Sequence, residues 1–177
     1  MPAGQLAGPF GLARSASGVL NFIGRNGDGA YDFGSGVAVN GPQFWVGGLD
    51  GGSMSYLTTS PNVGQISFPV AIVAGNSGSL VFAKTGPLQP GANGPLWGIP
   101  LTVNDSAYVL TFDDAGRMTR QWPLLGGAAN HAEIYNGTMT RVGDDIIVAV
   151  MGSGYSFRGQ PLAPDLQMRL FVMAFRE

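Results

Sequence analysis

Clusters of glycine and proline punctuate this chain roughly every eight to twelve residues, and that spacing limits what it can fold into. The 177 residues include 29 glycines and 12 prolines. Each glycine inside a helix costs about 1 kcal/mol relative to alanine, so few windows could form one. We therefore predict an all-β fold in which short antiparallel strands are joined by tight turns.

The predicted strands are short apolar runs that lie between turn signals. Residues 146–150 are apolar throughout, which predicts a strand covered on both faces. The Pro/Gly-rich stretch at 85–95 is predicted to be a loop or an arm. The predicted strands cover residues 18–23, 36–39, 44–46, 54–58, 66–74, 79–83, 99–103, 107–112, 117–122, 134–142, 146–151 and 168–175.

The length of the chain favours one domain over residues 1–177. Two domains of half this size would each bury too little surface to be well stabilised. The expected architecture is a β-sandwich or jelly-roll-like domain built from antiparallel sheets.

The sequence also contains two similar units, each with a Gly-rich lead-in, a strand, a tight turn and an apolar strand. One covers residues 27–46 and the other residues 126–150. Together with the segment 108–127, they resemble the repeats of bacterial β-propellers. The residues that carry the resemblance are Phe112, Asp113, Gly116, Trp122, Leu125, Gly126 and Gly127, with Gly34, Gly36, Val37 and Val39 in the first copy.

The resemblance implies an alternative fold of propeller-like blades. Propellers have about four to eight blades, more than this chain can supply, so closure would require oligomerisation. Small propellers with few blades per chain are known as lectins, so the resemblance also implies a glycan-binding function.

Charge is scarce in this sequence. Charged residues make up 11% of the chain, against about 25% in an average protein, and the net charge is −2. No basic cluster is present to bind nucleic acid or a membrane surface. No apolar run reaches the roughly 20 residues that span a membrane, and the first residues do not match a secretory signal. A surface this poor in charge favours self-association, while the compartment stays open.

One short segment resembles a catalytic motif. Gly75-Asn-Ser-Gly-Ser79 is similar to the nucleophile loop of chymotrypsin-like serine proteases, which would make Ser77 the nucleophile. In that family the histidine base precedes the serine, whereas the single histidine here, His131, follows it. The alternative interpretation is a tight turn between two strands. A serine hydrolase using Ser77 is the third functional hypothesis, and no enzyme activity is expected.

Metal ligands are equally sparse. Asp28 and Asp32 stand in a Gly-rich segment with oxygen ligands at alternating positions, a pattern that Ca²⁺ favours. No glutamate follows at EF-hand spacing, so a solvated turn is the simpler interpretation. His131 and Glu133 could form part of a zinc site, but without cysteine only carboxylates could complete it, so a hydrogen-bonded loop histidine is the simpler interpretation. We expect no metal and no cofactor.

These observations favour a structural or assembly protein that packs through low-charge β surfaces against itself or other structural proteins. Virion components, such as phage head decoration or tail proteins, have similar compositions. The alternative hypothesis is a lectin-like attachment module that stacks exposed aromatic rings on surface glycans. The aromatic residues that could do so are Trp45, Trp97, Trp122 and Tyr155.

Overall fold

The structure is a computed structural model, and it describes residues 8–25, 30–32, 38–40, 44–59, 67–85, 107–127, 133–153, 155–157, 160–161 and 168–177. Within these ranges the regular elements are all β-strands in antiparallel pairs, without a helix. The predicted all-β antiparallel fold is confirmed. In this part of the chain no helix is long and apolar enough to cross a membrane.

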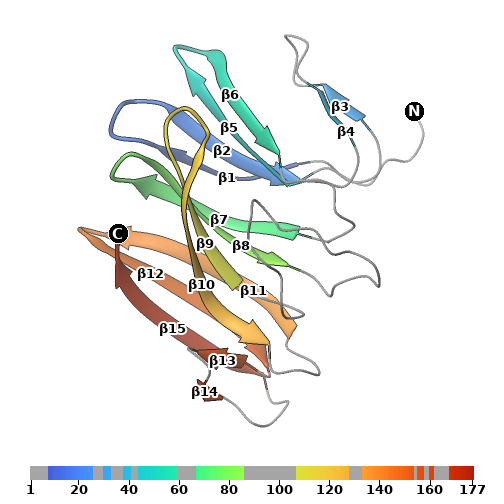
Figure 1. The fold of residues 1–177 in the computed structure, drawn as a ribbon, viewed down its shortest axis with the longest axis vertical. Helices are drawn as coiled ribbons and strands as arrows, with labels where there is room; N and C mark the ends of the chain where they lie inside the picture. The colour runs from blue at the N-terminus through green and yellow to red at the C-terminus, as the bar shows by residue number, and fades with distance from the viewer. Residues whose placement is uncertain are drawn as a thin grey trace.

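The strands form three large sheets and one small hairpin (Figure 1). The first sheet has the order β1 (Gly8–Arg14), β2 (Leu20–Arg25), β5 (Phe44–Asp50) and β6 (Ser53–Thr59). The second has β7 (Ser67–Gly75), β8 (Gly78–Thr85), β9 (Ala107–Phe112) and β10 (Met118–Gly127), extended by β13 (Tyr155–Phe157) and β14 (Gln160–Pro161). The third has β11 (Glu133–Val142), β12 (Asp145–Ser153) and β15 (Arg169–Arg176), while β3 (Ala30–Asp32) pairs with β4 (Ala38–Asn40).

Most neighbours in a sheet are also neighbours in the chain. Predicted turns join three of these pairs, at residues 75–78, 113–116 and 143–145. The β7–β8 hairpin turns through two residues, Asn76 and Ser77, between the paired Gly75 and Gly78. Gly78 has a φ of +111°, which L side chains rarely adopt, and a Cβ there would overlap the carbonyl oxygen of Phe112. Glycine at this position therefore lets the hairpin close against β9.

The three sheets stack face to face in chain order. One core lies between the first and second sheets, where Ile23 and Val46 meet Val81 and Leu110. A second core lies between the second and third sheets. Its buried members are Leu80, Phe82, Ala107, Val109, Met139, Ile146, Val148 and Val150. The second sheet is therefore covered on both faces, so the stack has three layers, one more than a simple sandwich.

Two local features differ from the sequence prediction. Strand β1 was not predicted because its glycines and proline indicate a loop, but Gly11 brings it close to β7: a Cβ there would lie 2.9 Å from Ile72 Cγ2. The turn signal at residues 40–42 does not join two paired strands, since β4 pairs with β3 and β5 pairs with β2 and β6. The predicted strand 99–103 and most of the predicted loop 85–95 lie outside the described residues.

Candidate interaction surface

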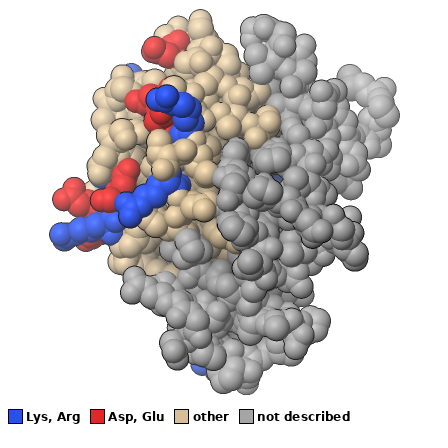
Figure 2. All heavy atoms as spheres, viewed as in Figure 1, with Lys and Arg blue, Asp and Glu red and all other residues tan. Residues whose placement is uncertain are grey.

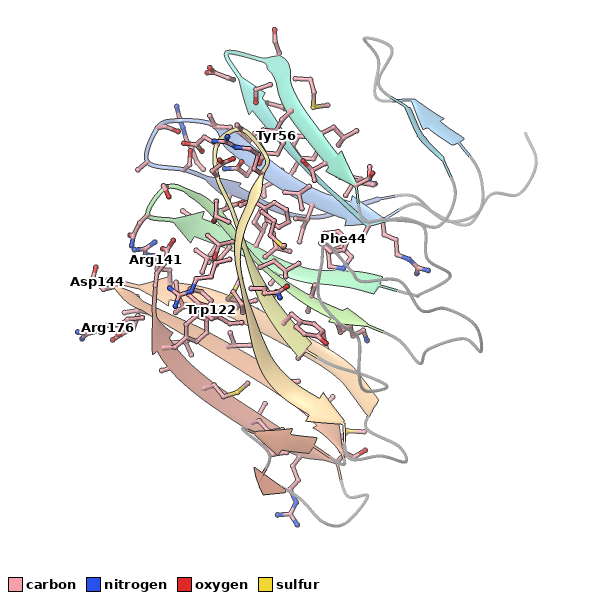
Figure 3. The ribbon with its side chains drawn as sticks, viewed as in Figure 1. Phe44, Tyr56, Trp122, Arg141, Asp144 and Arg176 are labelled. Atoms are coloured by element: carbon pink, nitrogen blue, oxygen red, sulfur yellow. The ribbon has the colours of Figure 1, made fainter. Side chains whose placement is uncertain are left out.

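Ser77 lies at the exposed tip of the β7–β8 hairpin. The tip is tied down by polar contacts of its neighbour Asn76, whose backbone N–H donates to Glu177 Oε2 at 2.8 Å. Arg141 of β11 donates to Asn76 Oδ1, to the Ala74 carbonyl at 3.0 Å and to Glu177 Oε2 at 3.1 Å (Figure 3). These contacts join the second and third sheets at their hairpin ends. His131, the residue that a serine nucleophile would need as its base, lies outside the described residues.

In the described part of the chain no three His, Asp or Glu side chains gather into a metal site, and the side chains of the predicted metal ligands lie outside that part. Asp28 lies outside the described residues, and Asp32 ends β3 with a side chain that also lies outside them. Glu133 begins β11, and its side chain is likewise not described.

The aromatic residues proposed for glycan stacking occupy different settings. Trp45 of β5 is 2% exposed and packs edge-to-face on Phe22 with ring centroids 5.5 Å apart. Trp122 of β10 is half-buried: Phe175 packs on it at 5.2 Å, and the Arg120 guanidinium lies 4.6 Å from its ring centroid. Trp45 is therefore closed to a ligand, and Trp122 already has a ring and a cation packed on it.

The side chains of the other two aromatic residues lie outside the described part of the structure. Trp97 lies outside the described residues, and Tyr155 begins β13 with a side chain that is not described. The glycan-binding hypothesis therefore depends on these two residues.

Charged side chains of the described residues gather at the hairpin ends of the sheets, on the left in Figure 2. Most of them bind one another or nearby backbone. Arg117 pairs with Asp113 at 2.8 Å, and Ser17 donates to Asp114 at 2.6 Å. At the opposite ends of their strands lie Arg25, Lys84 and Arg169. Charge in the described part of the chain is therefore concentrated at the hairpin ends but not confined to them.

The third sheet has an outer face, on the side away from the second sheet, that is apolar and open. The pairing of β12 with β15 places Ala149 opposite Val172 and Met151 opposite Leu170 on this face. The outer face consists of Asn136, Thr138, Thr140 and Val142 from β11, Asp145, Ile147, Ala149 and Met151 from β12, and Leu170, Val172, Ala174 and Arg176 from β15.

Large apolar side chains on this outer face are strongly exposed. Leu170 is 68% exposed, Val172 63% and Val142 60%, and Met168, just before β15, is 50% exposed. At one corner Arg176 donates to Asp145 Oδ1 at 3.0 Å, and this hydrogen bond to a carboxylate raises the pKa of the guanidinium. Because these two opposite charges pair, the outer face is neutral.

The other end of the stack is different. On the first sheet, the side away from the second sheet carries Phe22 and Trp45, and both are buried. Leu12 of β1 is the large apolar residue exposed there. The two ends of the stack are therefore unequal, and the open apolar sheet face of the described residues lies at the third sheet.

The sequence predicted the strands of this surface but not its exposure. The apolar run 146–150 predicted cover on both faces, and this is wrong for the chain alone. Ile146, Val148 and Val150 are buried, whereas Ile147 and Ala149 on the opposite face are only partly buried. The signal that could have located this surface is the continuous apolar run of β12, because the sheet that contains β12 is the last layer of the stack.

Comparison of the chain with known proteins gives no relative from which a function could be inferred. No protein-family model matches the chain, and neither the curated proteins nor the solved structures give a significant match.

Proposed function

We propose that this protein is a non-catalytic structural protein that assembles through low-charge β surfaces, with the outer face of the third sheet as its main contact. The class of assembly that we propose is a virion component, such as a phage head decoration or tail protein. The composition supports that class, since low charge and high glycine suit a protein whose surface is covered by neighbours.

The observation that carries the proposal is the exposure of Leu170 and Val172 beside each other on one sheet face. Fully burying a side chain of this size is worth about 1.5–3 kcal/mol relative to leaving it in water. Met151, which pairs with Leu170, extends the same apolar area, and Val142 is exposed at the far corner of the face opposite Asp145. A contiguous apolar patch on a neutral sheet is a typical protein-binding surface.

The test is self-association of the purified protein, measured as molar mass against concentration by light scattering. We expect the wild-type mass to rise with concentration. Val172→Lys should lower the association constant on the order of tenfold or more, because it places an uncompensated charge in the contact. The matched control is Leu12→Lys on the first sheet, which removes a side chain with the same 63% exposure from the other end of the stack.

Two results would contradict the proposal. One is a wild-type protein that stays monomeric up to the highest soluble concentration. The other is an equal loss of association in the Val172→Lys and Leu12→Lys variants, which would mean that the outer face has no special part in the contact.

A further inference from the structure

We infer that the outer face of the third sheet docks on the same face of a second copy of this chain, related by a twofold axis. This inference rests on the proposed function and names its partner. It follows from the residue pattern of β12 and β15, from the packing of the other sheets and from the charges on the face.

The strands of the third sheet have the sequence of strands that are covered on both sides. Residues 146–151 and 170–175 are continuous apolar runs, the pattern of strands with two buried faces. Within the chain only one of those faces is covered. Val148 and Phe171 pack toward the second sheet, while Ala149 and Val172 face outward. A second sheet stacked on the outer face would satisfy the pattern.

The rest of the molecule shows which kind of cover suits such a face. The second sheet has apolar rows on both faces, and each row is covered by a whole sheet of the same chain. The outer face of the third sheet continues this stack at its lower end in Figure 1. Another sheet of the same type is therefore its natural cover. The far end of the stack is a poorer partner, because Phe22 and Trp45 there are already buried.

Charge on the outer face is compatible with an identical partner. Its two charged residues, Asp145 and Arg176, pair with each other at one corner. Two copies can therefore meet without opposing like charges or burying an unpaired one, which would cost several kcal/mol. The remaining residues of the outer face are apolar or carry small polar groups.

Edge-to-edge pairing of two β15 strands is the competing way to use this sheet. Among the described strands, β15 pairs with β12 alone. Pairing at that edge would leave the exposed Leu170 and Val172 in water, whereas stacking of the two faces buries them, so the face is the better contact.

Cysteine cross-linking tests the contact, since the chain has no cysteine of its own. An in-plane twofold axis through the centre of the face brings Ala149, at the middle of the central strand, near its own copy. Stacked sheets lie about 10 Å apart, beyond the roughly 7 Å between Cα atoms that a disulfide can bridge. A short bis-maleimide is therefore applied to Ala149→Cys, with the exposed Ser55→Cys on β6 as the control.

We expect the Ala149→Cys variant to give on the order of tenfold more covalent dimer than Ser55→Cys, measured by intact mass. Thr138→Cys, exposed on the same face, replaces Ala149→Cys if that variant does not fold. Association without preferential cross-linking from the outer face would overturn this inference and leave the proposed function standing. Absence of any association would overturn both.

Discussion

Tyr56 joins the first and second sheets through a single side chain. Its ring lies against Gly116 in the β9–β10 turn, where a Cβ would overlap it, and its hydroxyl donates to Asn21 Oδ1 at 2.5 Å (Figure 3). Asn21 is fully buried. Burial raises the pKa of the Tyr56 phenol to about 12. The residue therefore combines apolar packing with a hydrogen bond to a fully buried side chain.

Replacing Tyr56 by phenylalanine should keep the packing and remove the hydrogen bond. The buried Asn21 Oδ1 would then have lost the hydroxyl that donates to it, and an unsatisfied buried acceptor lowers the unfolding free energy by about 1–3 kcal/mol. The measurement is urea unfolding of the two proteins at neutral pH. An unchanged midpoint would show that the hydrogen bond adds nothing to stability.

The raised pKa of Tyr56 gives this prediction a pH dependence. The neutral phenol is favoured in the folded protein, so its stabilising effect is fully present below pH 10 and is lost as pH rises through about 12. The difference in stability between the wild type and Tyr56→Phe should therefore shrink over that range. A constant difference would mean that the phenol ionises alike in the folded and unfolded chains.

The partners of Tyr56 could not be predicted from the sequence. Asn21 is 35 positions away along the chain, and Gly116 lies in another sheet. The residue type indicated only a bulky aromatic that could be exposed or buried. Its role depends on how the first sheet stacks on the second, and no local pattern records that stacking.

Among the elements, the glycines of the hairpin turns contribute differently to stability, although they all have positive φ angles. Gly78→Ala should destabilise the fold strongly, because φ is +111° and the new Cβ would overlap the Phe112 carbonyl oxygen. Gly51→Ala in the β5–β6 turn is the matched control, with a φ of +56° and open space around it. It should cost only about 1 kcal/mol of backbone strain. Thermal unfolding of both variants checks this, and equal losses would contradict it.

Strands were more predictable than their pairing. Segments such as 107–112 and 146–151 form strands in the structure because compact apolar runs between turn residues leave few alternatives. Strand β1 was missed because glycine and proline hide its pattern. Strands β4 and β5 follow each other in the chain but pair with other strands, so a turn signal between two strands does not make them hairpin partners. The outer face likewise depended on sheet order, which the sequence does not encode locally.

In the whole molecule, the three sheets differ in how many of their apolar faces are covered. The second sheet is covered twice, the first sheet has a buried outward pair in Phe22 and Trp45, and the third sheet is open on one side. Most charged residues of the described part of the chain lie at the hairpin ends, away from the apolar rows. An assembly built on the outer face should consequently be driven by apolar contact, with little contribution from charge.

If apolar contact drives association, the effect of salt on the association constant can be predicted. Raising NaCl from about 50 mM to about 500 mM shortens the Debye length several-fold, yet the association constant should change little because the outer face is neutral. Sulfate at the same ionic strength should strengthen association, since it increases the free energy gained by burying apolar surface. Light scattering in the two salts distinguishes the effects. A steep loss of association in NaCl would instead show that ion pairs at the hairpin ends hold the copies together, and the contact would then have to be sought at that end of the sheets.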